Sequence, residues 1–213
     1  MIVEERMVTF IRSLETPNSE ILEQIEQEAL QDGVPIIRKE MQSFLKVLLL
    51  SLRPCRVLEV GTAVGFSALL MSEQLPENGH ITTIEKYEKR IPIARENFRR
   101  ARKEGQITLL EGDAMEILKE LSGPYDMIFM DAAKGQYIHY LPEAIRLLRK
   151  GGVLLSDNVL QDGDIIESRF AVERRNRTIH SRMREYLYTL KHDERLETSI
   201  LPLGDGAALS VKR

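Results

Sequence analysis

The chain has 213 residues, of which 43% are hydrophobic and 30% charged, and its 30 basic and 33 acidic residues give a net charge of −3. This length predicts one domain with a large core, and the composition excludes a disordered chain, a collagen-like fibre and a generally basic nucleic-acid binder. The single cysteine, Cys55, excludes an intrachain disulfide and a Cys-rich zinc site, which favours a reducing compartment such as the cytoplasm.

The first 52 residues carry helical periodicity and no strand pattern, which predicts an N-terminal helical extension. The spacing of the apolar residues predicts three helices, over residues 3–14, 19–33 and 38–52. The most apolar stretch lies in the third helix, where Lys46 interrupts it and Arg53-Pro54 ends it. We therefore expect no membrane span, and the polar N-terminus predicts no signal peptide.

From Arg56 onward, short apolar runs alternate with amphipathic helices, which is typical of stacked βαβ units and a mainly parallel sheet. Strands are expected at residues 56–60, 80–84, 107–110, 125–130 and 153–156, and the helices between them at residues 67–75, 89–103, 114–121 and 137–148. A longer helix, over residues 171–190, precedes two final strands at 196–200 and 207–211, and their short connection predicts an antiparallel hairpin. No linker divides the chain, so we expect a single α/β domain over residues 1–213, with the sheet core in 53–213.

The ends of the first three strands carry the residue types that bind an adenosine-containing ligand. Gly61 and Gly65 form a G-x-x-x-G turn, but Glu59 directly before it would repel a pyrophosphate. Glu85 follows the second strand, 24 positions after Gly61, a distance typical of an acid that meets a ribose diol. Asp113, after the third strand, can accept from an adenine amino group. The alternative for Glu85 and Asp113 is capping of the helices that follow them.

The fourth and fifth strands end in hard oxygen ligands. Asp131 follows the fourth strand, and Asp157 and Asn158 follow the fifth. Because these tips are adjacent, the three side chains predict a Mg²⁺ or Mn²⁺ site rather than a zinc site. The alternative is that Asp157 and Asn158 only cap a turn. Lys134, close after Asp131, is either a base whose pKa a nearby cation lowers or a solvated surface lysine.

Four segments together carry a resemblance to a known family. They are residues 59–69 (EVGTAVGFSAL), 130–137 (MDAAKGQY), 156–159 (SDNV) and 203–206 (LGDG). They resemble motifs of the cation-dependent, S-adenosylmethionine-using O-methyltransferases that act on catechols and caffeoyl-CoA. The resemblance extends from about Arg38 to the C-terminus. It implies a Rossmann-like, seven-stranded sheet with helices on both faces and an antiparallel last strand.

The same resemblance implies a set of site residues and a reaction. S-adenosylmethionine is expected at Glu59, Gly61, Gly65, Ser67, Glu85, Asp113, Ala114 and Asp131. The divalent metal, Mg²⁺ or Mn²⁺, is expected at Asp131, Asp157 and Asn158, and Lys134 matches the family's catalytic lysine. In this reaction the metal chelates two vicinal oxygens of the acceptor and lowers the pKa of the hydroxyl that receives the methyl group.

A basic segment distinguishes this chain from the animal catechol enzymes. Residues 169–184 carry +5 and the rest of the chain −8, and all six basic residues of the segment are arginines. Arg174, Arg177 and Arg184 are expected on one helical face. Arginine stacks on bases and bridges phosphates, so the segment predicts an RNA-binding surface. Its members are Arg169, Arg174, Arg175, Arg177, Arg182 and Arg184.

The sequence is compatible with two classes of methyl acceptor. The catechol enzymes have a tryptophan where this chain has Ala133, which predicts a wider site. Together with the arginines, this resembles the family's tRNA hydroxyuridine methyltransferases. It predicts methylation of 5-hydroxyuridine at the wobble position of the tRNA anticodon loop, giving 5-methoxyuridine. The alternative acceptor is a small catechol-like or CoA-linked phenol, with the arginines holding the CoA phosphates.

Two other classes of protein fit the sequence less well, and one assembly is expected. A dinucleotide-binding oxidoreductase would need a third glycine after Gly61 and Gly65, and a non-catalytic binding protein would be expected to lose the metal acids or Lys134.

We expect a homodimer, because the N-terminal helices expose a second apolar face and many members of the family are dimeric.

Overall fold

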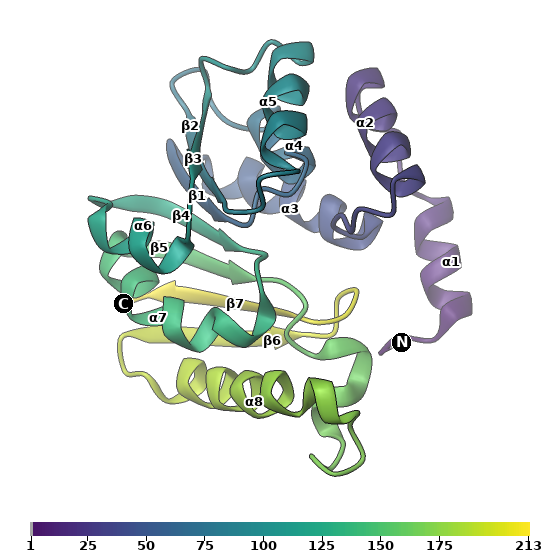
Figure 1. The fold of residues 1–213 in the computed structure, drawn as a ribbon, viewed down its shortest axis with the longest axis vertical. Coiled ribbons are helices and arrows are strands. Elements are labelled where there is room, and N and C mark those ends of the chain that lie inside the picture. Colours follow the sequence, from purple (N-terminus) through teal and green to yellow (C-terminus); the bar gives the residue numbers. More distant parts are fainter. Residues whose placement is uncertain (1) are drawn as a thin grey trace.

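A computed structural model describes residues 2–213 of the chain. One seven-stranded sheet lies between two layers of helices (Figure 1). The strands are β1 (Arg56–Val60), β2 (His80–Glu85), β3 (Ile107–Glu111), β4 (Tyr125–Met130), β5 (Leu148–Ser156), β6 (Leu196–Leu201) and β7 (Ala207–Lys212). The α-helices are α1 (Glu5–Ser13), α2 (Glu20–Gln31), α3 (Lys39–Leu52), α4 (Phe66–Ser72), α5 (Ile91–Arg100), α6 (Ala114–Glu120), α7 (Tyr137–Leu147) and α8 (Arg177–His192). Three 3₁₀ turns complete the set, at η1 (Lys134–Gln136), η2 (Gln161–Ile166) and η3 (Arg174–Asn176).

The sheet has the order β3-β2-β1-β4-β5-β7-β6. The first five strands are parallel, and β7 runs antiparallel to both β5 and β6. Each parallel neighbour requires a crossover, which the intervening helices supply. The Rossmann-like sheet with an antiparallel last strand is therefore confirmed. From β1 the chain adds β2 and β3 on one side, and then crosses back to add β4 and β5 on the other side. The topological switch point, where the strand order reverses, therefore lies between β1 and β4.

Alternation along the central strands builds a separate core on each face of the sheet. Val57 of β1 packs with helices α2 to α5, whereas its neighbour Leu58 packs with helices α6 to α8. Both side chains are fully buried. In β4, Phe129 and Met130 divide between the two cores in the same way. Successive strand residues point to opposite faces, so a strand buried on both sides must be apolar throughout, as β1 and β4 almost are.

The N-terminal helices differ in how deeply they join the core. Leu22 of α2 and Leu45 of α3 are fully buried, so both helices are part of one core layer. Helix α1 has no buried residue among those described; Phe10 on it and Leu14, directly after it, are 59% and 67% exposed. It lies at the edge of the molecule in Figure 1. The homodimer expected from this apolar surface stays a prediction.

The two largest differences from the element boundaries expected from the sequence are at the starts of β5 and α8. Strand β5 begins at Leu148, before Gly151-Gly152. Leu148 pairs with Tyr125, and the register then shifts so that the next pair is Met127 with Val153, which leaves the two glycines inside the strand. Helix α8 begins at Arg177 rather than near residue 171. The preceding segment turns instead and buries Val172, which is 6% exposed. Arg174 therefore lies outside α8, and the expectation that it shares a helical face with Arg177 and Arg184 is wrong.

Among the helices of residues 2–213, none combines the length and the apolar character needed to cross a membrane.

The contact that fixes α8 to the sheet can be tested at Tyr186. Its side chain is fully buried, and its hydroxyl lies 2.6 Å from Ser156 Oγ. Tyr186→Phe removes the tyrosine hydroxyl and leaves the buried Ser156 hydroxyl without this partner, so we expect the free energy of unfolding to fall by about 1–3 kcal/mol. Tyr188→Phe is the control, because Tyr188 is 65% exposed and a surface change costs within about 0.5 kcal/mol. Urea denaturation measures both, and an equal effect of the two substitutions would contradict the assignment.

Candidate active site

A pocket of about 560 Å³ opens at the carboxyl ends of the parallel strands, beside the switch point between β1 and β4. This is the position at which open α/β sheets bind ligands. Seven residues singled out from the sequence line it, namely Gly61, Glu85, Ala114, Asp131, Lys134, Asp157 and Asn158. Four others, Glu59, Gly65, Ser67 and Asp113, are not part of its lining.

The loop after β1 approaches the end of β4 so closely that only glycine fits at position 61. Gly61 has φ +106°, and a Cβ there would lie 2.0 Å from the backbone oxygen of Asp131. Glu85 fixes this loop, because its carboxylate accepts hydrogen bonds from the backbone N–H of Ala63 and of Tyr87, each at 2.8 Å. Gly65, with φ +85°, is the N-cap residue of α4. The loop is thus held rigidly at one wall of the pocket.

Glu59 lies behind this loop and is fully buried. Its carboxylate accepts from Ser67 Oγ and Thr83 Oγ1, each at 2.5 Å. Burial raises the pKa of Glu59 to about 7; the two hydroxyl hydrogen bonds oppose this rise, while Asp131 and Glu85 add to it. Ser67 borders a narrower hollow next to the main pocket. Glu59 and Ser67 therefore support the loop from inside the protein.

Asp113 adopts the capping role that the sequence left open. Its carboxylate accepts from the N–H of Met115 at 2.9 Å, at the start of α6, and Lys86 Nζ lies 3.3 Å away. The hydrogen bond to Met115 lowers the pKa of Asp113. The side chain is about half exposed, while the next residue, Ala114, lines the pocket.

Two carboxylates and an amide meet at the tips of β4 and β5. Burial raises the pKa of Asp131 to about 6, although Lys134 opposes the rise. Asp157 is 3% exposed, and burial together with the charge of Asp131 raises its pKa well above the usual range. Tyr137 joins the two strand ends, because its hydroxyl is 3.2 Å from the backbone oxygens of both Met130 and Asp157. This corner of the pocket therefore has a negative electrostatic potential when both carboxyls are ionised, and its geometry is rigid.

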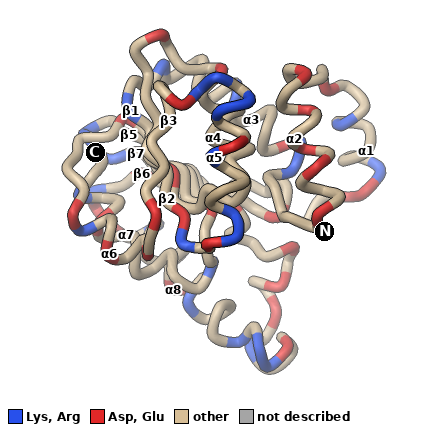
Figure 2. Tube along the Cα trace, turned by 45° about the horizontal axis from the view of Figure 1, so that its top comes forward, with Lys and Arg blue, Asp and Glu red and all other residues tan. Residues whose placement is uncertain are grey.

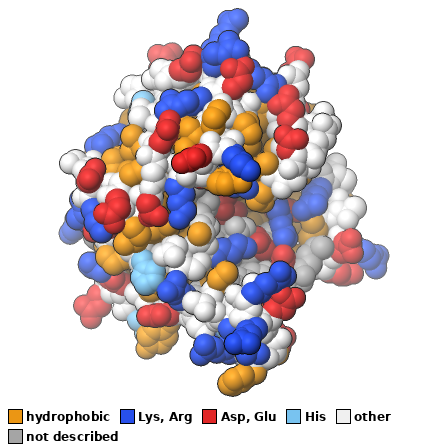
Figure 3. Space-filling model, viewed as in Figure 1, with side chains coloured by type: hydrophobic (Ala, Val, Ile, Leu, Met, Phe, Trp, Pro, Cys, Tyr) orange, Lys and Arg blue, Asp and Glu red, His pale blue; other side chains and the backbone are white. Residues whose placement is uncertain are grey.

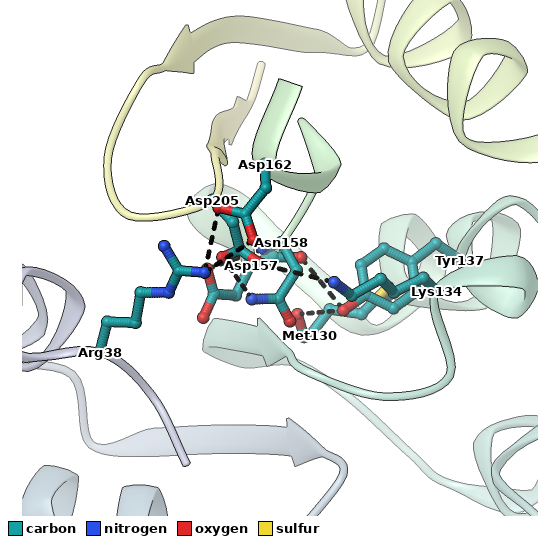
Figure 4. Close-up of polar contacts among 8 residues, drawn as sticks. All are labelled: Arg38, Met130, Lys134, Tyr137, Asp157, Asn158, Asp162 and Asp205. Atoms are coloured by element: carbon teal, nitrogen blue, oxygen red, sulfur yellow. Dashed lines mark hydrogen bonds and ion pairs between the residues drawn. The ribbon is translucent and has the colours of Figure 1, made fainter. Parts of the chain in front are cut away.

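Asp205, in the turn between β6 and β7, connects the amide to the lysine (Figure 4). Asn158 Nδ2 donates to Asp205 Oδ1 at 2.7 Å, and Lys134 Nζ lies 3.4 Å from Asp205 Oδ2. Asn158 itself has φ +59°, a left-handed conformation that asparagine tolerates better than most residues. The sequence motif LGDG contains Asp205, but its place opposite Lys134 follows from the hairpin and is not visible in the sequence.

Arg38, just before α3, completes the far side of the pocket (Figure 4). Its Nη2 donates to both carboxylate oxygens of Asp162, at 3.0 and 2.9 Å. These two residues are 124 positions apart in the sequence, and no motif surrounds either of them. The ion pair therefore could not be predicted from the sequence. The ion pair connects the N-terminal helices to the segment that follows β5.

The arginines expected to bind RNA are partly engaged within the protein. Arg182 Nη1 donates to the backbone oxygen of Gly135 at 3.1 Å, and Arg184 Nη1 to that of Ile165 at 2.8 Å. Arg177 donates to two backbone oxygens of the segment that precedes α8.

The remaining arginines of the group lie in the segment between β5 and α8. Arg175 pairs with Glu173 at 2.7 Å, whereas the side chains of Arg169 and Arg174 have no hydrogen-bond or ion-pair partner among residues 2–213. Figure 2 shows acidic positions next to the basic ones along this part of the chain.

Comparisons with known proteins agree with this fold and show a family. A family profile described as O-methyltransferase matches residues 12–213. The chain is 38% identical over 141 residues to a catechol O-methyltransferase of Niastella koreensis, covering 63% of this chain and 64% of that protein. It is 32% identical over 177 residues to caffeoyl-CoA O-methyltransferase 2 of Populus trichocarpa, covering 78% and 70%. The structure of an SAH-bound methyltransferase of Podospora anserina superposes with a TM-score of 0.88 at 25% identity, over 98% and 94%.

The chain therefore belongs to the O-methyltransferase family. At the level of the family, the O-methyltransferase class expected from the sequence is confirmed.

The raised pKa of Glu59 predicts how stability depends on pH. A buried carboxyl with a folded-state pKa near 7 holds its proton to higher pH than in the unfolded chain, where the value is about 4.5. Stability is therefore lost as pH rises from about 4.5 through about 7. Glu59→Gln removes this titration, so the variant should gain up to about 3 kcal/mol relative to the wild type between pH 5 and pH 8. Urea denaturation at both pH values tests this, and a difference independent of pH would contradict it.

Proposed function

We propose that this protein transfers a methyl group from S-adenosylmethionine to a hydroxyl of a catechol-like or CoA-linked phenol, with the help of a divalent cation. The observation that carries the proposal is the meeting of a glycine loop, one buried and one half-buried carboxylate, an amide and a lysine in one pocket. Relatives of the chain that are named catechol and caffeoyl-CoA O-methyltransferases support the choice of acceptor.

The proposed cofactor site lies along the loop after β1. There Gly61 and Ala63 line the pocket, so a ligand can approach the backbone of the loop closely. Glu85 lines the pocket beside this loop and is proposed to bind the ribose, with Asp113 and Ala114 on the adenine side. Glu59, Gly65 and Ser67 are proposed to hold the loop in shape. The SAH bound to the Podospora relative is the demethylated form of this cofactor, which supports the assignment.

The residues at the tips of β4 and β5 fit a divalent cation. Asp131 and Asp157 are carboxylates with raised pKa values, so a bound cation would relieve the cost of keeping both ionised. The proposed third donor is the amide oxygen of Asn158, which lines the pocket and whose Nδ2 donates to Asp205. All three donors are oxygens, which suits Mg²⁺ or Mn²⁺. When bound, such a cation holds two neighbouring acceptor oxygens and lowers the pKa of the reacting hydroxyl.

Lys134 is proposed to move the proton in the reaction. Asp205 holds its Nζ at 3.4 Å, on the pocket side of the turn after β4. In its neutral amine form, Nζ can there accept the hydroxyl proton and become an ammonium, while the acceptor oxygen takes the methyl group from the sulfonium and SAH leaves. Fixed positions of acceptor and cofactor then contribute most of the rate enhancement.

A small phenol is preferred over tRNA for a specific reason. Arg177, Arg182 and Arg184 donate to backbone oxygens of the protein itself, so half of the expected RNA-binding arginines have a role in folding. A hydroxyuridine in tRNA also offers two neighbouring oxygens, and it remains the second candidate acceptor.

A comparison of acceptors tests the proposed function. The protein is incubated with S-adenosylmethionine, Mg²⁺ and one of three acceptors: catechol, caffeoyl-CoA or tRNA containing 5-hydroxyuridine. We expect SAH formation with the phenols, its loss in excess EDTA and its return when Mg²⁺ or Mn²⁺ is added back, because the oxygen donors require a hard cation. Full turnover in EDTA would refute the metal assignment, and faster methylation of tRNA than of either phenol would favour the second candidate.

A substitution of Lys134 tests its proposed role. Lys134→Ala should lower kcat by roughly 10²- to 10⁴-fold with little change in the KM for S-adenosylmethionine, since the lysine acts on the proton of the acceptor. The matched control is Lys150→Ala, because Lys150 is an exposed lysine in β5. Steady-state kinetics at saturating Mg²⁺ measure both variants. If Lys134→Ala retains the kcat of the control, the lysine is only a surface charge.

A further inference from the structure

The buried side of α8 contains a histidine without a partner. His180 is 2% exposed, and within residues 2–213 neither of its ring nitrogens has a hydrogen-bond partner. A neutral imidazole has one N–H donor and one acceptor nitrogen. Leaving such groups buried and unpaired lowers the stability of the folded protein. The cost requires an explanation, and a ligand that reaches the ring would provide one.

His180 borders an open hollow of about 510 Å³ between the start of α8 and the segment after η2. Ser168, Arg169, Ser181 and Arg184 are also part of its lining. None of its lining residues belongs to the pocket at the strand ends, so it is a separate site. In Figure 3, basic side chains gather at the lower end of the molecule, where this segment lies.

The polar groups of this hollow are mostly donors. Arg184 is fixed by its hydrogen bond to Ile165, which uses Nη1 and leaves its other N–H groups available. Arg169 has no side-chain partner among the described residues, and Ser168 Oγ only accepts, from the N–H of Phe170. Glu167 is the one acid in the lining, so the two arginines outweigh it. Guanidinium, hydroxyl and imidazole donors around a hollow suit a phosphate group.

We propose that this hollow binds a single phosphate group, either free or carried by a small ligand. The site lies outside the groups that carry out methyl transfer; where the methyl acceptor carries the phosphate, the inference rests on the proposed function. A single phosphate fits better than a nucleic-acid backbone, since the neighbouring Arg177 and Arg182 donate to backbone oxygens of the protein. Arg182 reaches Gly135, beside Lys134, so the phosphate site and the proposed active site share the same helix.

The binding test uses NMR of the histidine rings. The chain has four histidines, so ring ¹⁵N resonances are few, and the one missing from His180→Gln identifies His180. Inorganic phosphate and pyrophosphate are titrated at constant ionic strength. We expect the His180 resonances to move saturably, and an Arg169→Gln, Arg184→Gln double variant, which retains His180, to bind at least tenfold more weakly. Arg195→Gln is the control, because Arg195 pairs with Asp193 outside the hollow and should bind as the wild type does.

Several outcomes would overturn the site. They are His180 resonances that do not move, resonances that move equally in the double variant, and a short RNA that shifts them at lower concentration than pyrophosphate. This measurement does not depend on turnover, so a failure of the proposed methyl transfer leaves its result unchanged.

A second experiment separates the two sources of the phosphate. If the methyl acceptor carries it, the double variant should raise the KM for caffeoyl-CoA about tenfold and leave the KM for free catechol unchanged. If both KM values are unchanged while phosphate still binds to the wild type, the site takes a free phosphate. Both results support the hollow as a phosphate site, whereas an equal rise of both KM values would attribute the effect to a general loss of structure.

Discussion

The active-site geometry depends on hydrogen-bond ladders that continue one residue beyond the strands. Gly61 N–H donates to Ile84, Asp131 N–H to Val60 and Asp157 N–H to Met130, all at 3.0–3.1 Å. These bonds keep three loops in the register of the sheet at the point where ordinary loops diverge. As a result the glycine turn and the two aspartates have fixed relative positions, and groups that are fixed before a ligand binds need no costly ordering afterwards.

This rigidity concentrates negative charge in a small volume. Glu59, Asp131 and Asp157 all have raised pKa values, and each is affected by at least one of the other acids of the site. Buried like charges cost stability unless a cation compensates them. Lys134 lies near enough to lower the pKa of Asp131, and a divalent ion would compensate further. The site is thus costly for folding and suited to binding a cation.

The C-terminal third of the chain completes the site from the other side. Strand β7 enters the sheet antiparallel between β5 and β6, so the turn before it returns to the tips of the parallel strands. Gly206 allows this return, because its φ is +99° and a Cβ there would lie 2.4 Å from Leu160. That turn brings Asp205 to Lys134 and Asn158. Helix α8 then covers the face of the sheet and uses Arg182 to hold the turn that carries Lys134.

The sequence alone determined the parallel strands, the hairpin and the order of acids at the strand ends, because alternation, glycine turns and local spacing are properties of neighbouring residues. It did not determine Arg38 with Asp162 or Asp205 with Lys134, since such pairs depend on segments that only the folded chain brings together. The tertiary structure also decided which groups the arginines of residues 169–184 contact. A charge pattern gives the number and sign of the charges, but only the fold decided that Arg182 and Arg184 donate to backbone oxygens of the protein.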